Sequence, residues 1–140
     1  MKWTIACDFD GVIHQYTTKQ KGEWDPLYIP DPIMPGAVEW LTEMVQKFKV
    51  VIYSARFTPH GNTEADWVAA CQAMEEVKVW MLGQGVPLDV MTKLHFWMEP
   101  GKPTALVYID DRGFRFEGVF PSKEQIHQLR PWKVNDGPAR

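Results

Sequence analysis

The sequence predicts an α/β domain built on a parallel sheet with helices on both faces, and three observations support this fold class. Short apolar runs typical of buried strands alternate along the chain with longer segments of helical periodicity. The apolar runs are rich in β-branched residues, as in strands that are covered on both faces. Three of the runs end in polar or acidic residues, at the position where open α/β sheets bind their ligands. With 140 residues, the chain is expected to form a single domain over residues 1–140.

The first strand is expected at Thr4 to Cys7, and it is followed at once by Asp8, Asp10 and Gly11. Side chains two residues apart on an extended backbone point the same way, so the two aspartates are expected to share one space. Two like charges there repel each other unless a cation lies between them. Gly11 allows a sharp turn that brings backbone amides near the bound group. The alternative is an ordinary Asp–Gly surface turn.

Residues 13–35 form a polar stretch that contains four prolines. Beside a carboxylate site, such a stretch is predicted to be a flap or a substrate-contact loop. Its aromatic residues either pack the flap down or stack on a substrate. They are Tyr16, Trp24 and Tyr28.

The middle of the chain predicts a helix, a strand and a second helix. The first helix opens at Pro35-Gly36 and reaches Phe48, and the strand Lys49 to Tyr53 follows and ends in Ser54-Ala55-Arg56. After the loop at 57–63, a long helix is expected from about Glu64 to Leu82, capped by Asn62 or Thr63 and ended by Gly83 and Gly85. Its inner face is expected to comprise Trp67, Ala70, Cys71, Met74, Val77 and Met81.

The last third of the chain predicts shorter elements. A third strand is expected within Val86 to Thr92, followed by an irregular stretch with His95, Trp97 and Glu99. A fourth strand, Thr104 to Ile109, leads to Asp110 and Asp111. Residues 116–120 are expected as an edge strand or an extended segment, Ser122 as the cap of a last short helix, and the tail at 131–140 as loosely held.

Composition and charge exclude several classes of protein. The net charge of -3 argues against a protein that coats nucleic acid by bulk charge, although a local basic pocket stays open. Cys7 and Cys71 are too few for a disulfide framework and are expected to be buried, reduced and inert. With no leading signal segment and no apolar run near the length of a membrane span, we expect a cytoplasmic protein without a membrane partner. The oligomeric state stays open.

Four motifs in chain order resemble the haloacid dehalogenase-like superfamily, in its Mg²⁺-dependent phosphatase branch. The first motif of that superfamily appears as Asp8-Phe9-Asp10-Gly11-Val12, and Ser54 matches the second, a Ser or Thr that ends an apolar strand. The third is a lysine upstream of the fourth strand, and the fourth is the pair Asp110-Asp111. The resemblance covers nearly the whole chain. It implies a three-layer α/β/α Rossmann-like fold, here without a cap domain.

The resemblance implies hydrolysis of a phosphomonoester through an aspartyl-phosphate on Asp8. Asp10 would protonate the leaving alkoxide and then deprotonate the water. Ser54 and Lys102 would hold the phosphoryl oxygens and neutralise their charge. The implied Mg²⁺ ligands are Asp8, Asp10 through its backbone carbonyl, Asp110 and Asp111, and the implied substrate contacts are Gly11, Ala55 and Arg56.

Several assignments have alternatives. Lys102 is favoured over Lys93 as the motif lysine because it directly precedes the strand that carries the acids. The segments Ser54-Ala55-Arg56 and Ile109 to Arg112 look like those of the 3′-phosphatase domains of polynucleotide kinases. Arg56 therefore reaches a substrate phosphate or forms an ordinary salt bridge. Arg112 is expected to brace the acidic pair or the chain end by hydrogen bonds, and His60 is either a substrate contact or an exposed loop histidine.

The substrate is left open among a phosphorylated small molecule, a nucleotide and a nucleic-acid end. The runner-up function is a noncatalytic module that binds metal or phosphate on the same fold, and a third is a phosphotransferase or phosphonate-type enzyme. Dehalogenation is disfavoured, because dehalogenases lack the second aspartate of the first motif, here Asp10.

Overall fold

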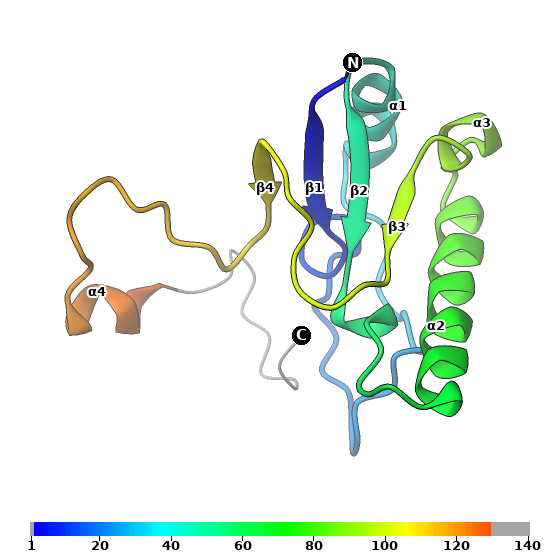
Figure 1. Cartoon of the computed structure of the whole chain (residues 1–140), viewed down its shortest axis with the longest axis horizontal. Coiled ribbons are helices and arrows are strands. Elements are labelled where there is room, and N and C mark those ends of the chain that lie inside the picture. Colours follow the sequence, from blue (N-terminus) through cyan, green and yellow to red (C-terminus); the bar gives the residue numbers. More distant parts are fainter. Residues whose placement is uncertain (1, 130–140) are drawn as a thin grey trace.

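A four-stranded, entirely parallel sheet organises the chain in the computed structural model, which describes residues 2–129 (Figure 1). The strand order is β3-β2-β1-β4. Thr4–Asp8 forms β1, Lys49–Tyr53 forms β2, His95–Trp97 forms β3 and Val107–Ile109 forms β4. The predicted α/β class and parallel sheet are confirmed. The fourth strand is shorter than the predicted Thr104 to Ile109.

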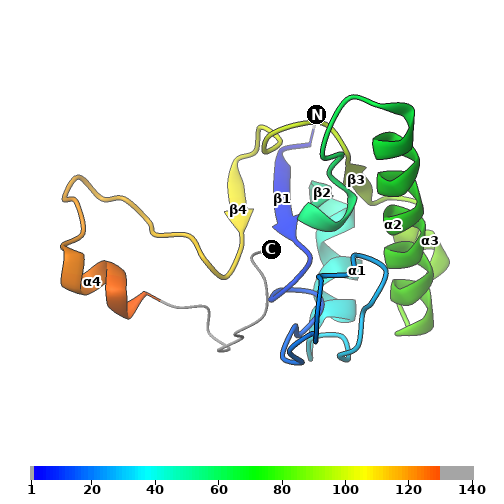
Figure 2. The ribbon, with the colours of Figure 1, turned by 90° about the horizontal axis from the view of Figure 1, so that it is seen from below.

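Two helices pack against one face of this sheet, whereas helices were predicted on both faces (Figures 1 and 2). Helix α1 spans Ala37–Lys47 and α2 spans Glu64–Gly83. Alternate residues of the central strands form one buried cluster with residues of both helices. The strands supply Ile5, Cys7, Val50 and Ile52, α1 supplies Leu41 and Val45, and α2 supplies Ala73, Val77 and Met81. The core therefore fixes β1 and β2 side by side, and their carboxyl ends meet at one edge of the sheet.

The long helix begins where its predicted cap lies, but its inner face differs from the prediction. Thr63 caps α2 in a capping box with Asp66. The predicted inner-face residues Trp67 and Cys71 are exposed, whereas Ala70 and Ala73 are buried. Apolar residues lie almost all round this helix, so the spacing alone does not select one face.

The two cysteines differ in environment. Cys7 is buried as predicted. Its burial raises the pKa of its thiol, and the negative charge of the nearby Asp8 carboxylate raises it by a smaller amount. The prediction of burial is wrong for Cys71, which lies on the outer surface of α2.

The prediction of a third strand within Val86 to Thr92 is wrong. This segment contains the short helix α3, Leu88–Met91, and the strand β3 lies in the stretch that was expected to be irregular. Pro87 has no N–H for a sheet ladder, and its carbonyl instead accepts hydrogen bonds from Val90 and Met91. Three residues of β3 are too few to show a clear alternation in the sequence.

The segment after β4 leads away from the sheet to a last short helix (Figure 1). Ser122 caps α4, Lys123–Gln128, as predicted. Residues 116–120 form no strand and are not extended, because the chain bends at 117–119 and Gly118 has a φ of 96°. The tail at 131–140 lies outside the described residues. Within residues 2–129, no helix is both long and apolar enough to span a membrane.

Candidate active site

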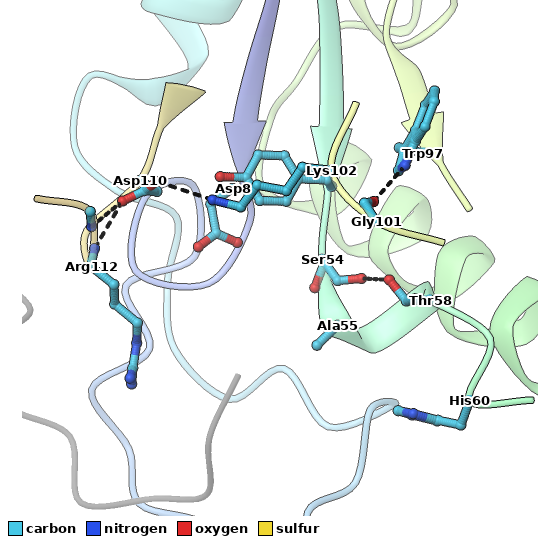
Figure 3. A pocket seen from close by; sticks show the side chains of 12 residues that line it. Asp8, Ser54, Ala55, Thr58, His60, Trp97, Gly101, Lys102, Asp110 and Arg112 are labelled. Atoms are coloured by element: carbon cyan, nitrogen blue, oxygen red, sulfur yellow. Dashed lines mark hydrogen bonds and ion pairs between the residues drawn. The ribbon is translucent and has the colours of Figure 1, made fainter. Parts of the chain in front are cut away.

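A cavity of about 570 Å³ opens at the carboxyl ends of β1, β2 and β4 (Figure 3). The register pairs Asp8 with Tyr53 at the last positions of β1 and β2, so both residues reach this edge. The 3₁₀ turn η1, Ala55–Phe57, and the connection from β3 to β4 supply the remaining wall. The lining residues are Asp8, Tyr53, Ser54, Ala55, Thr58, His60, Trp97, Gly101, Lys102, Asp110, Arg112 and Gly113.

Two carboxylates and one ammonium group share this cavity. Asp8 is half-buried, and its Oδ1 accepts a hydrogen bond from the Phe9 N–H at 2.8 Å. The Asp110 Oδ2 lies 3.8 Å from the Lys102 Nζ (Figure 3). The cavity thus combines a carboxylate at the end of β1 with a cation and a second carboxylate from the neighbouring edge.

The backbone after β4 fixes the carboxylate of Asp110. Its Oδ1 accepts the N–H groups of Arg112 at 3.0 Å and Gly113 at 2.6 Å. A Cβ at position 113 would lie 2.9 Å from that oxygen, so glycine permits this close approach. Arg112 therefore holds Asp110, the first residue of the acidic pair, through its backbone amide.

Lys102, and not Lys93, lies in the cavity. The Lys102 ammonium is 5.6 Å from the ring centre of Tyr53 and 5.3 Å from that of Tyr108. These contacts are in the range of cation–π interactions and hold the side chain over the two rings. Lys93 is exposed and does not line the cavity.

Ser54 is buried at the end of β2 and lines the cavity. Its Oγ accepts the N–H of Arg56 at 3.1 Å and so caps η1, while its carbonyl accepts the Thr58 hydroxyl at 2.8 Å. The Ser54 hydroxyl keeps its own proton, which it can donate to an anionic oxygen. Ala55 and His60 also line the cavity, and His60 is exposed on its loop.

Asp10 lies in a buried ionic cluster and does not line the cavity. It is 1% exposed, and its Oδ2 accepts a hydrogen bond from the Arg56 Nε at 2.8 Å. Its Oδ1 lies 2.8 Å from the His14 Nδ1. Strand β1 ends at Asp8, so the alternation that would place Asp10 beside Asp8 stops before residue 10. The structure therefore separates the two aspartates of the first motif.

The partners of His14 determine its proton positions. The backbone N–H of Asp31 points to the His14 Nε2 at 3.1 Å, and a backbone amide can only donate. The His14 Nε2 is therefore the acceptor, and its Nδ1 carries the proton that it donates to Asp10. Asp10 accepts this hydrogen bond as an ionised carboxylate.

The pKa of Asp10 reflects this environment. Burial alone would raise the pKa, but the hydrogen bond from His14 and the guanidinium charge and hydrogen bond of Arg56 outweigh it. The pKa of Asp10 is therefore lower than its ordinary value. In this conformation the carboxylate has no proton to give to a leaving group.

The salt-bridge alternative for Arg56 agrees with its observed contacts. Besides Asp10, the guanidinium binds the flap, because its Nη1 donates to the carbonyls of Pro26 at 3.0 Å and Tyr28 at 2.9 Å. Arg56 is 2% exposed and does not line the cavity. This arginine therefore ties the 13–35 segment to the turn that follows β1.

The flap is further held by its own hydrogen bonds. The Asp31 carboxylate accepts the N–H groups of Thr17 and Thr18, each at 2.8 Å, and the Thr18 hydroxyl. Tyr16 is buried, which matches the alternative that flap aromatics pack down, whereas Tyr28 is exposed.

Asp111 and Gly11 line a second, smaller hollow that also includes Asp110. The acidic pair thus stands between the cavity and this hollow. Sequence reasoning missed Tyr53 and Thr58 as cavity residues, and it missed His14 as the partner of Asp10. The only available signal for His14 was its position four residues after Asp10.

The carboxylates suit a magnesium ion by their chemistry. Oxygen ligands are those that Mg²⁺ prefers, and Asp8 and Asp110 line one cavity with Asp111 beside it. Within residues 2–129, no three His, Cys, Asp or Glu side chains stand close enough together to hold a metal. The donor types therefore fit, although the acids are not drawn together into one coordination group.

Comparison of the chain with protein-family models, with curated proteins and with solved structures finds no match.

Proposed function

We propose that the protein is a Mg²⁺-dependent phosphomonoester hydrolase of the haloacid dehalogenase type, acting through an aspartyl-phosphate on Asp8. One observation carries this proposal: Asp8, Lys102 and Asp110 line the same open cavity at the carboxyl end of a parallel sheet. This is the edge at which open α/β sheets bind ligands.

The residues of the cavity divide the work of phosphoryl transfer. Asp8 is the carboxylate that attacks phosphorus, because it is partly exposed at the end of β1. Lys102 lies on the same wall and offsets the negative charge of the phosphoryl oxygens. The hydroxyl of Ser54 donates a hydrogen bond to one of these oxygens.

The metal site implied by the resemblance would use the same acids. Asp8, Asp110 and Asp111 would hold Mg²⁺, together with the backbone carbonyl of Asp10. When bound, the ion screens the repulsion between an anionic nucleophile and an anionic phosphate.

The acid–base role proposed for Asp10 requires a rearrangement. Its carboxylate would have to leave His14 or Arg56, turn towards the cavity and gain a proton. Asp10→Asn tests this role directly: aryl phosphates, whose leaving groups need no proton, should still be cleaved, while alkyl phosphates should not. Equal rates of wild type and variant on alkyl phosphates would exclude the role.

We infer further that the chain has the parallel sheet of this superfamily without a cap domain. The third layer that the resemblance implies has no helix within residues 2–129, because α1 and α2 pack on one face and α4 lies away from the sheet. Supporting the absence of a cap, residues 98–106 between β3 and β4 contain no helix or strand, and residues 9–36 contain only isolated bridges. An open cavity of this kind suits a bulky phosphate ester, including a nucleotide or a nucleic-acid end.

The alternative is a noncatalytic phosphate-binding module. The hydrogen bonds of Asp10 with His14 and Arg56 favour it, because they hold this carboxylate away from the cavity. A panel of phosphorylated metabolites and 3′- and 5′-phosphorylated oligonucleotides separates the two functions. The enzyme is expected to release phosphate with Mg²⁺ and not with chelator. Release confined to 3′-phosphorylated ends would indicate nucleic-acid processing. Binding of Mg²⁺ and phosphate without release from any substrate would favour the module.

A further inference from the structure

The hydroxyl of Tyr53 is a buried polar group in the wall of the cavity. Tyr53 is the last residue of β2 and lies beside Asp8 in the sheet register. Its Oη is shielded from solvent, and no residue in 2–129 makes a hydrogen bond to it. A buried hydroxyl without a partner is costly, so such a group in a native protein needs an explanation, and a role at the reaction site is one of them.

The neighbouring Tyr108, which packs against Tyr53 from outside the cavity lining, provides a comparison. The two rings meet edge to face with centres 6.5 Å apart, and the Lys102 ammonium lies over both. The Tyr108 hydroxyl donates to the Pro103 carbonyl at 2.6 Å and is not part of the cavity lining. One tyrosine therefore uses its hydroxyl to hold the segment that carries Lys102, and the other has its hydroxyl without a partner.

Tyr53 lies in the same cavity as the proposed reacting groups. It shares the cavity with Asp8, Ser54 and Lys102. Lys102 over its ring places the phenol on the same wall as the ammonium. A phenol keeps its proton at neutral pH and therefore acts as a donor to an anionic oxygen.

We propose that Tyr53 is a substrate-binding residue whose hydroxyl donates a hydrogen bond to a phosphoryl oxygen held beside Asp8 and Lys102. This inference rests on the proposed phosphatase function and adds to it a contact that the four motifs do not include. The wall formed by Tyr53 and Lys102 then recognises the phosphoryl group with one neutral donor and one cation.

The test compares Tyr53→Phe with the matched variant Tyr108→Phe in the full chain. Binding of inorganic phosphate is measured by calorimetry with Mg²⁺ present, kcat and KM are measured on p-nitrophenyl phosphate, and Tm is measured for each protein. Tyr53→Phe should weaken phosphate binding and raise KM by about 10-fold, as for loss of a hydrogen bond to a charged group. Its Tm should equal or exceed that of wild type, because no protein hydrogen bond is lost. Tyr108→Phe should lower the Tm.

The outcomes separate this inference from the proposed function. If wild type neither binds phosphate nor releases it from any substrate, the proposed function fails and this inference fails with it. If wild type binds phosphate and Tyr53→Phe binds it equally well with an unchanged KM, the inference is overturned and the function stands. Weaker binding accompanied by a fall in Tm like that of Tyr108→Phe would mark the hydroxyl as structural and would also overturn it.

Discussion

Asp8 lines an open cavity with Lys102 and Asp110, whereas Asp10, two residues along the chain, is buried between His14 and Arg56. The two side chains are chemically identical. Asp8 is half-buried and lines the cavity together with the exposed Lys102, while Asp10 is 1% exposed and accepts hydrogen bonds from the buried His14 and Arg56.

The two aspartates of the first motif therefore have different roles, although they are only two residues apart. Asp8 belongs to the strand, so it reaches the edge of the sheet where ligands bind. Asp10 belongs to the turn, and its carboxylate joins that turn to η1 and to the flap. We therefore expect Asp8 to govern activity and Asp10 to contribute strongly to stability.

Replacement of Asp8 should have the largest effect on activity. Asp8→Asn removes the proposed nucleophile and should lower kcat by about 10,000-fold or more. The free energy of unfolding should change by no more than about 0.5 kcal/mol, because the side chain is partly exposed. Mg²⁺-dependent phosphate release and urea denaturation measure the two effects. Full activity in this variant would contradict a covalent mechanism on Asp8.

Replacement of Asp10 should have the largest effect on stability. Asp10→Ala leaves the Arg56 guanidinium buried without its carboxylate and should lower the free energy of unfolding by about 3–5 kcal/mol. The urea midpoint gives this value, with Asp8→Ala as the matched control. Similar losses for both alanine variants would remove the proposed division between the two acids.

The two candidate lysines should differ clearly in activity. Lys102→Ala removes the ammonium from the cavity and should lower kcat/KM by about 100- to 1,000-fold, the range for loss of one charge-stabilising group. Lys93→Ala, at an exposed position outside the cavity, should keep the wild-type value. Phosphate release by the two variants side by side decides the assignment, and the opposite pattern would transfer the role to Lys93.

The dependence of stability on pH should report the buried cluster. Because the folded-state pKa of Asp10 is lower than its unfolded value, its contribution is present above the unfolded pKa and is lost as pH falls through the folded pKa. Asp31 acts in the same sense. Burial raises its pKa, but the hydrogen bonds from Thr18 and Thr17 outweigh burial, so the pKa of Asp31 is lower than its ordinary value. Wild type should therefore lose stability below about pH 4, the ordinary aspartate range, and Asp10→Asn should lose less. Urea midpoints measured from neutral to acidic pH test this, and parallel curves for the two proteins would contradict it.

Much of the fold could be predicted because local signals and the global pattern agree. The β-branched run at 49–53 and the Thr63 cap each have a direct physical reading, and both elements lie where predicted. The third strand was missed because Pro87 and three aromatic-rich residues at 95–97 give little periodicity. Cys71 was misplaced because α2 is apolar on nearly every side.

The residues of the candidate site that follow strands could be predicted from the sequence, but the buried contacts around them could not. Asp8, Ser54 and Asp110 follow apolar runs, so a parallel sheet brings them to one edge. The burial of Asp10 depends on Arg56, 46 residues away, and on backbone carbonyls of the flap. Contacts at such separations leave no pattern in one sequence. The same is true of Tyr53, whose hydroxyl matters through what surrounds it in the fold.

The most direct test of Asp8 as the nucleophile is to trap the phosphorylated protein. Wild type mixed with p-nitrophenyl phosphate and Mg²⁺ is quenched in acid and analysed by intact-mass and peptide mass spectrometry. We predict one phosphoryl group on the peptide that contains Asp8, removed by hydroxylamine and absent from Asp8→Asn. Phosphate release by wild type without any such adduct, or an adduct that persists in Asp8→Asn, would contradict the central claim that Asp8 is the nucleophile.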